Sequence, residues 1–153
     1  MLTKLKYVGV PTADLIHIYL LYIRSLLEYC SVVWHSTLTV QQSDNLERVQ
    51  KLSLKIILGQ YYDGYENALK WSGLERLVER REQRCLKFGL KSLLHPVHSK
   101  MFPINPLTDK NLPGTRHREH FVVNKAKSEY YKKSAIPHIQ RQLNEHVRRQ
   151  QNQ

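Results

Sequence analysis

Cysteine is scarce in this chain, with Cys30 and Cys85 the only two among 153 residues. So few cysteines exclude the small disulfide-stapled scaffold that many secreted domains use in place of a large core. Both lie at apolar positions of expected helices, so we expect buried, reduced thiols. Two His-x-x-His pairs, at residues 95–98 and 117–120, lack cysteine partners at zinc-site spacing. No metal site is therefore expected.

Hydrophobic runs are also short. The apolar stretch Leu15–Ile23 is bounded by Asp14 and Arg24 and is interrupted by His17. A membrane-spanning helix needs about 20 apolar residues, so we expect this stretch to be a core helix. No secretory signal is recognisable, which predicts an intracellular protein, nuclear or cytoplasmic, without a membrane partner.

Acidic residues are few, with 13 Asp and Glu against 24 Lys and Arg, for a net charge of +11. The aspartates Asp14, Asp44, Asp63 and Asp109 are isolated from one another in the sequence. Magnesium prefers several oxygen ligands in octahedral geometry, and this pattern does not assemble such a site. We therefore expect a protein without catalytic residues or cofactor.

The positive charge is concentrated toward the C-terminus. Residues 1–95 contain 13 basic and 9 acidic residues, whereas residues 96–153 contain 11 basic and 4 acidic ones. Such an excess favours an anionic partner, RNA or DNA above all, through phosphate contacts of low sequence specificity. The alternative is a solvated basic surface without a specific partner.

Helical periodicity dominates residues 1–95. It predicts helices over residues 12–34, from a Thr39 or Ser43 cap to residue 58, and over 65–71, and a fourth from a capping box at 72–75 to about residue 94. We expect an all-α domain, an irregular bundle of four to five helices.

Prolines then punctuate the chain, which predicts a second region at 96–153. This region is expected to be a basic, Pro-rich extended tail. It comprises a loop over 96–128, with a short strand at 121–123, and one amphipathic helix over about 134–149.

Two linked motifs stand in the helical region: YIRSLLEYCSVVWH at residues 22–35 and LERVQK at residues 46–51. With the segments 56–59 and 65–69, and Leu143-Asn144 near the end, they resemble the C-terminal region of reverse transcriptases from non-LTR (LINE-type) retrotransposons. That region follows the catalytic palm and includes the thumb and the helices after it. The resemblance covers most of the chain.

The resemblance implies a fragment of a transposable-element RNA-directed DNA polymerase, truncated before the palm. The palm's paired metal-binding aspartates have no counterpart here, so the fragment is expected to be non-catalytic. The implied role is to help bind template and primer, and the missing palm is a further implied partner.

Charge and resemblance together nominate eleven nucleic-acid-binding cations. Three of them share one helix face through their i, i+3, i+7 spacing: Arg48, Lys51 and Lys55. Two belong to an arginine cluster: Arg80 and Arg84. The other six lie in the tail: Arg116, Arg118, Lys125, Lys127, Lys132 and Lys133.

Several residues near these cations could have a structural role instead of contacting nucleic acid. Arg81 falls near the apolar stripe, and we expect it to pair with a carboxylate, for instance Glu28 or Glu47. The tail aromatics Phe121, Tyr130 and Tyr131 either stack on bases or, as we favour, anchor the tail to the helical body. The basic helix face itself could be an ordinary solvated surface.

Three alternative interpretations of the chain remain open. The chain could be a helical protein–protein interaction module or a functionless folded remnant, with an apolar patch exposed at Leu2, Leu5 and Tyr7. An independent DNA-binding domain is less favoured, because the glutamines and asparagines of residues 41–50 do not align toward base edges.

Overall fold

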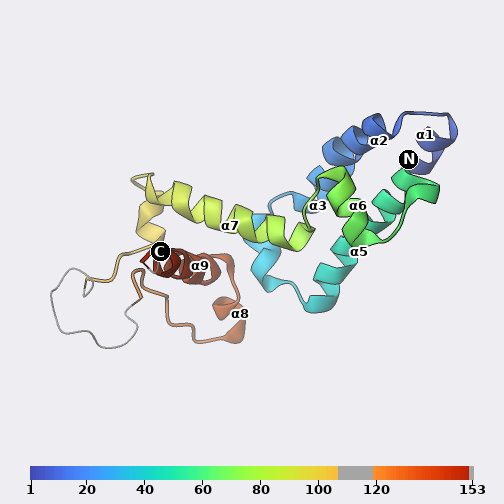
Figure 1. Ribbon diagram of the computed structural model, residues 1–153. Coiled ribbons are helices and arrows are strands. Elements are labelled where there is room, and N and C mark those ends of the chain that lie inside the picture. Colours follow the sequence, from blue (N-terminus) through green and yellow to red (C-terminus); the bar gives the residue numbers. More distant parts are fainter. Residues whose placement is uncertain (107–118, 152–153) are drawn as a thin grey trace. The chain divides into compact units, whose positions relative to one another are not determined.

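The computed structural model describes residues 1–106 and 119–151. Within these ranges the chain is mostly helical and contains no strand (Figure 1). A single antiparallel bridge joins Ile104 to Phe121. The all-α class is thus confirmed, whereas the strand expected at 121–123 is wrong and amounts to this one bridge.

The described helices belong to two compact units. The first comprises residues 1–31 and 38–81, and the second comprises residues 32–37 and 82–153. The division falls within helix α7 (Leu77–Leu93). It does not coincide with the boundary expected at residue 95, because the second half of α7 packs against the C-terminal helix.

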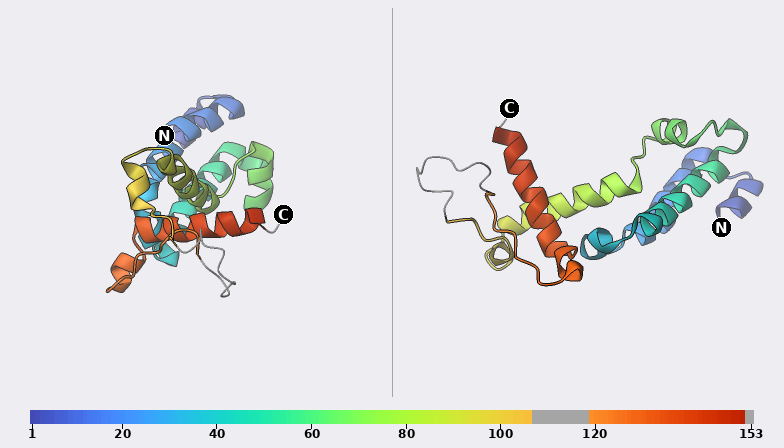
Figure 2. Two further views of the ribbon diagram at one scale, coloured as in Figure 1. Left: turned by 90° about the vertical axis from the view of Figure 1, so that its left-hand side faces the viewer. Right: turned by 90° about the horizontal axis from the view of Figure 1, so that it is seen from below.

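The first unit is built around α5, with α1 and α2 lying along it (Figure 2). Its elements are α1 (Leu2–Tyr7), α2 (Thr12–Ile18), a π-helical turn (Tyr19–Arg24), α3 (Ser25–Glu28), α5 (Val40–Leu58), a 3-10 turn (Gly59–Tyr61), α6 (Tyr65–Ser72) and the first residues of α7.

Helix α5 begins and ends where the sequence predicts. The Thr39 side chain accepts the N–H of Gln42 at 3.2 Å, and the Gln42 side chain accepts the N–H of Thr39 at 2.9 Å. This reciprocal capping box satisfies two N-terminal donors. At the other end, Lys6 Nζ donates to the carbonyls of Ile56 and Ile57, each at 2.8 Å. A cation at a helix C-terminus is favourable, so this contact ties α1 to α5.

The helix expected over residues 12–34 is interrupted. It ends at Glu28, and Cys30 adopts a φ of 50°, in the left-handed region that non-glycine residues rarely enter. Helix α4 (Ser31–Trp34) starts after this turn. The turn leaves Cys30 exposed, which corrects the expectation of a buried thiol there; Cys85 is buried as expected.

The junction between α6 and α7 also differs from the prediction. Gly73 adopts a left-handed conformation, with a φ of 65°, and ends α6. Ser72 donates back into α6 and caps nothing after it, so the capping box expected at 72–75 is wrong. Helix α7 begins at Leu77, whose N–H donates to Glu47 Oε2 at 3.0 Å. A carboxylate 30 residues earlier in the chain therefore caps α7.

Two apolar clusters stabilise the first unit. One joins α1, α2 and α5, and the other joins α5 to α6: Leu2, Leu15, Tyr19 and Ile57 in the first; Leu54, Leu58, Ala68 and Leu69 in the second. Leu2 is buried and Leu5 is half-buried, so the expected exposed patch at this end is reduced to Tyr7.

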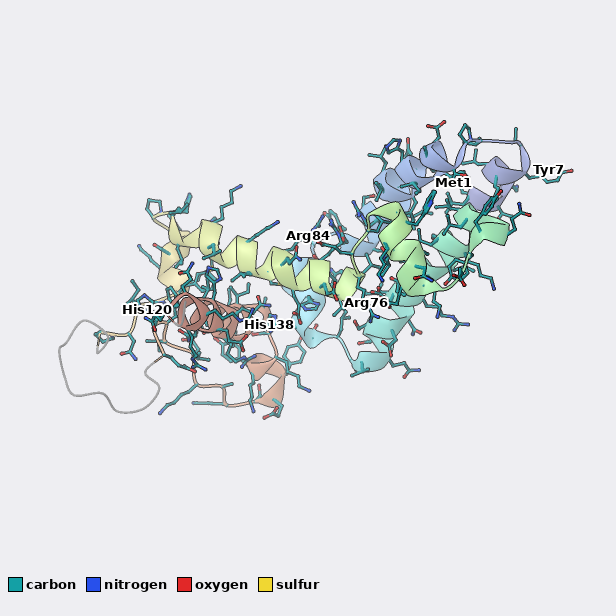
Figure 3. The ribbon with its side chains drawn as sticks, in the orientation of Figure 1. Met1, Tyr7, Arg76, Arg84, His120 and His138 are labelled. Atoms are coloured by element: carbon teal, nitrogen blue, oxygen red, sulfur yellow. The ribbon has the colours of Figure 1, made fainter. Side chains whose placement is uncertain are left out.

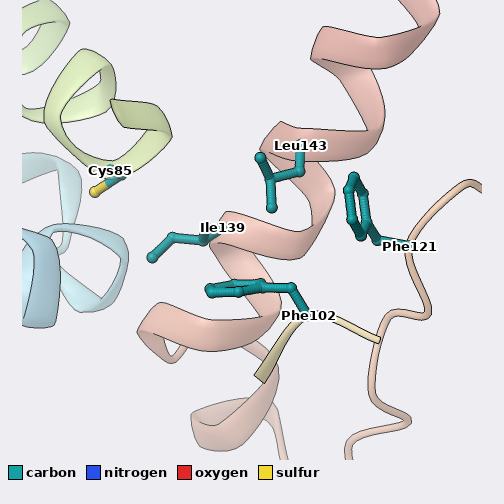
Figure 4. Packing of buried hydrophobic residues seen from close by; sticks show 5 residues of the cluster. All are labelled: Cys85, Phe102, Phe121, Ile139 and Leu143. Atoms are coloured by element: carbon teal, nitrogen blue, oxygen red, sulfur yellow. The ribbon is translucent and has the colours of Figure 1, made fainter. Parts of the chain in front are cut away.

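The second unit has its own core. It contains a 3-10 turn (His35–Thr37), the second half of α7, another 3-10 turn (His98–Met101), α8 (Glu129–Lys132) and α9 (Ala135–Gln151). Five buried side chains from α7, α9 and the segments between them meet in one cluster (Figure 4): Cys85, Phe102, Phe121, Ile139 and Leu143.

Two buried amides of α9 hold the extended segment 121–124. Asn144 Oδ1 accepts the N–H of Phe121 at 2.7 Å, and its Nδ2 donates to the Phe121 carbonyl at 2.9 Å. Gln140 Oε1 accepts the N–H of Asn124 at 3.1 Å. These bonds satisfy backbone groups that a neighbouring strand would otherwise pair.

Candidate nucleic-acid interface

The three cations nominated on α5 lie together on its solvent face. Arg48, Lys51 and Lys55 are exposed, and no hydrogen bond or ion pair joins their side chains to another described residue. Their spacing places them over about two turns of one side of the helix. Asp44 is one turn before Arg48 on the same side, so the surface keeps a local excess of two positive charges.

The opposite side of α5 is anchored by a buried polar network. Gln50 Oε1 accepts a hydrogen bond from the hydroxyl of Tyr19 at 2.6 Å. Gln50 Nε2 donates to the Tyr65 hydroxyl at 2.9 Å and to the Glu75 carbonyl at 3.0 Å. The Tyr65 hydroxyl donates in turn to Glu47.

Burial, the main cause, raises the pKa of both tyrosines, Tyr19 and Tyr65, well above the usual range. Both hydroxyls therefore remain protonated donors. The network holds α5 in a fixed orientation, so the cations project from a well-positioned helix.

The arginine cluster at the start of α7 is largely structural. Arg80 Nε donates to Glu28 Oε1 at 2.6 Å, and this bond raises the pKa of the Arg80 guanidinium. Arg81 is fully buried and donates to Ser43 Oγ at 2.8 Å. Arg84 is an exposed residue of α7 (Figure 3).

The expectation that Arg81 lies inside the structure is confirmed. The pairing of Arg81 with Glu28 or Glu47 stays a prediction. Glu28 Oε1 accepts from Arg80, and the side chain of Glu28 is only 2% exposed. Arg80 is thus engaged by Glu28, although its side chain stays 24% exposed.

The four nominated tail lysines are all exposed, at positions 125, 127, 132 and 133. Lys132 Nζ lies 3.4 Å from Glu129 Oε1 on α8. Lys125, Lys127 and Lys133 have no side-chain partner among the described residues. The nominated Arg116 and Arg118 lie outside the described residues.

The three tail aromatics divide between two roles. Phe121 is buried in the core of the second unit, as the anchoring role predicts. Tyr130 is 81% exposed and anchors nothing, which is opposite to our expectation. Tyr131 is partly exposed, and its hydroxyl accepts from Asn124 Nδ2 at 3.3 Å. Of these three aromatics, Tyr130 has the most exposed ring, and it lies close in sequence to Lys132 and Lys133.

No metal centre is evident in residues 1–106 and 119–151, where no three His, Cys, Asp or Glu side chains cluster. The rings of His95 and His98 stack with centroids 4.2 Å apart. His95 Nδ1 accepts the N–H of Val97 at 3.3 Å, which is a local turn contact. The pair at 117–120 lies mostly outside the described residues.

An exposed apolar strip on the first unit was missed by the sequence analysis. It comprises side chains of the π-helical turn, α3 and the residue after α3, each at least 60% exposed: Leu21, Tyr22, Leu26 and Tyr29. In a regular α-helix Leu26 would lie on the same face as the buried Leu15 and Tyr19. The π-helical turn changes the angular position of later residues, which is why this face leaves the core.

The same region has the length and the apolar composition that a membrane-spanning helix needs. Thr12–Thr37 is 26 residues long, and 17% of its most apolar 18-residue window is buried. Core helices and signal sequences share these properties, so this is weak evidence for a span. The intracellular location and the lack of a membrane partner stay predictions.

No protein-family description, no curated protein and no solved structure matches this chain. The resemblance to reverse transcriptases therefore rests on the sequence motifs alone. The arrangement of charged and polar groups described above is what bears on function.

Proposed function

We propose that this chain is a non-catalytic, thumb-like region of a non-LTR retrotransposon reverse transcriptase, and that it helps to hold RNA or DNA by its phosphates. The observation that carries the proposal is the α5 surface of Arg48, Lys51 and Lys55, exposed on one side of a helix that is capped and anchored on the other. A row of unengaged cations on a rigid support suits a regularly spaced phosphate backbone.

The tail lysines support a second contact region for the same ligand class. Lys125, Lys127, Lys132 and Lys133 are exposed, and the open ring of Tyr130 lies among them in the sequence. Cations interleaved with an accessible aromatic ring suit a single-stranded segment, because every base has a face to stack. Arg84 joins the proposed contacts as an exposed cation of α7.

Three residues of the motifs that carry the resemblance have structural roles, and these roles are compatible with the proposed function. Glu28, Glu47 and Gln50 belong to the motifs at 22–35 and 46–51, and each makes a long-range polar contact in the first unit. In this proposal the buried polar residues of the motifs maintain the helical support, and the exposed cations, which include Arg48 and Lys51 of the second motif, contact nucleic acid.

The test is a salt titration of binding to a labelled RNA–DNA hybrid, single-stranded RNA and duplex DNA. We expect micromolar binding at low salt and a steep log–log slope, because each neutralised phosphate contributes about 0.9 units. Binding that is absent even at low salt would contradict the proposal.

A charge-matched pair of variants assigns the binding to α5. Reversal of Arg48, Lys51 and Lys55 to Glu should lower the slope by about 2–3 units. Reversal of Lys4, Lys70 and Lys100, which are exposed lysines outside the proposed contacts, changes the net charge equally. The control should lower the slope far less; equal losses would show that only overall charge matters.

The exposed apolar strip favours a second candidate, a helical protein–protein interaction module. Leu21 and Leu26 are 69% and 77% exposed, and a contiguous strip of such side chains is typical of a docking surface. Replacing both with Gln should abolish association with a protein partner, or self-association in sedimentation experiments, without unfolding the chain. A strip that shows no association at any concentration would exclude this candidate.

A further inference from the structure

A hollow of about 560 Å³ opens on the first unit, where the turn after α5 and helix α6 face the start of α2. Its volume is in the range of small-molecule sites. Seven residues line it: Thr12, Leu58, Tyr61, Asp63, Asn67, Ala68 and Trp71. None of the proposed nucleic-acid contacts is among them.

The hollow is lined mainly by apolar and aromatic side chains. Leu58 and Ala68 are buried core residues that contribute to its surface. Tyr61 and Trp71 are 79% and 60% exposed, so much of each ring is open to solvent. Two large aromatic side chains at one hollow provide contact area at a low cost in side-chain entropy.

Charge distinguishes this hollow from the rest of the chain. Asp63 is the one charged group among the described residues that line it, and none of these is Lys, Arg or His, although the chain carries a net charge of +11. Asn67 Nδ2 donates to the Asp63 carbonyl and to Asp63 Oδ2, each at 3.2 Å. These bonds orient the carboxylate and leave its other oxygen and the Asn67 amide oxygen as acceptors.

We propose that this hollow binds an organic cation whose charge is spread over an apolar body, such as a quaternary ammonium group. Aromatic faces attract such cations electrostatically, and a carboxylate at the rim adds direct attraction. The same carboxylate disfavours phosphate and carboxylate ligands. The site is independent of the proposed nucleic-acid role.

Trp71 provides the reporter for a direct test. The chain has two tryptophans, so a Trp34→Phe variant of the full chain leaves Trp71 as the sole indole fluorophore. We expect choline to change its emission saturably. The neutral isostere 3,3-dimethyl-1-butanol should bind at least about fivefold more weakly, because it lacks the charge that the aromatic rings and Asp63 recognise. Equal binding of the two compounds would overturn the proposal.

Two single-charge variants locate the effect. Asp63→Asn should weaken choline binding by about fivefold, since a partly exposed carboxylate contributes modestly. Asp44→Asn removes the same charge near the other end of α5, 14 residues before Leu58 and thus roughly 20 Å away along the helix. It should leave choline affinity unchanged; a loss equal to that of Asp63→Asn would contradict a local site.

One further ligand distinguishes whether the cation belongs to a protein or to a free metabolite. A peptide containing trimethyl-lysine that binds more tightly than choline would indicate a protein partner, whereas the reverse order would indicate a free metabolite. Adenosine and guanosine test the competing class. Saturable nucleoside binding with no response to choline would show a base-stacking site and overturn the proposal.

Discussion

Arg76 and Arg80 each form an ion pair with a glutamate, but their surroundings differ. Arg76 pairs with Glu66 where both side chains are about half exposed. Arg80 pairs with Glu28, whose side chain is 2% exposed. An exposed pair is screened by water, whereas a buried carboxylate depends on its partners for compensation of its charge.

We therefore expect unequal effects of two matched substitutions. Arg80→Ala should lower the free energy of unfolding by about 2 kcal/mol, less than for a fully buried pair because Arg80 is partly open to solvent. Arg76→Ala should have a small effect. Urea denaturation of the two variants makes the comparison, and similar losses would contradict a structural role for the Arg80–Glu28 pair.

His138 on α9 is a residue whose protonation opposes folding (Figure 3). Burial, assisted by the charge of Arg141, lowers its pKa below the usual 6.5, while Glu145 acts in the opposite direction. Its Nε2 is buried and has no hydrogen-bond partner in the described part of the chain, and the centroid of the His35 ring lies 5.6 Å away. The neutral imidazole is thus the form that the folded chain accommodates.

The sign of the pH effect follows from proton counts. Below about pH 6.5 the unfolded chain binds a proton at His138 that the folded chain excludes, so stability falls as the pH decreases. His138→Gln should reduce this loss between pH 7 and 5, measured as the pH dependence of the urea midpoint. An unchanged pH dependence would show that other groups cause it.

At the scale of elements, Gly89 determines how closely α7 approaches α9 in the second unit. A Cβ added at Gly89 would lie 2.6 Å from Ile139 Cγ2 and 3.3 Å from two Leu143 methyl groups. Both of these side chains are almost fully buried in the cluster of Figure 4. A methyl group at this position therefore has no space unless the helices separate.

Gly89→Ala should destabilise the chain by about 1–2 kcal/mol, although alanine is the better helix former, because overpacking outweighs helix propensity here. Thermal unfolding followed by circular dichroism measures the effect. In an Ile139→Ala background, which removes the clashing methyl, the same change should cost less or become stabilising. A stabilising Gly89→Ala on its own would show that the two helices separate readily.

Helix α5 shows how one element serves two purposes. Its buried side carries Gln50, Leu54 and Ile57, and its exposed side carries the nominated cations. The apolar contacts and the Gln50 network fix the helix without using the exposed side. Charge reversal on the exposed side should consequently alter ligand binding and leave the fold intact.

At the scale of the whole molecule, the basic charge is spread over both units. The α5 cations belong to the first unit, and the lysines at 125–133 belong to the second. If both sets contact one nucleic acid, their contributions to counterion release add, since each phosphate contact releases ions independently.

Reversal of Lys125, Lys127, Lys132 and Lys133 should thus lower the salt slope for single-stranded RNA by about 3 units. Combining it with the α5 reversal should lower the slope by about the sum of the separate effects. Fluorescence anisotropy over a salt series gives these slopes. A combined loss no larger than either alone would show that the two sets do not bind together.

Much of the helical framework was predictable from the sequence. The Thr39–Gln42 capping box and Gly59 bracket α5 in both prediction and structure, and α9 occupies the expected C-terminal segment. These features depend on residues within one or two helical turns of each other. The exposure of the α5 cations followed from the same local spacing.

The sequence by itself determined the helical class, the α5 bounds and the basic character, because periodicity, capping and charge are local properties. Only the tertiary structure decided which polar groups are buried and what they contact. Glu47 caps α7, Glu28 meets Arg80, and Asn144 holds Phe121, each across 20 or more residues. Such pairings depend on where distant helices pack, since burial imposes a hydrogen-bond partner on each polar group and packing supplies it.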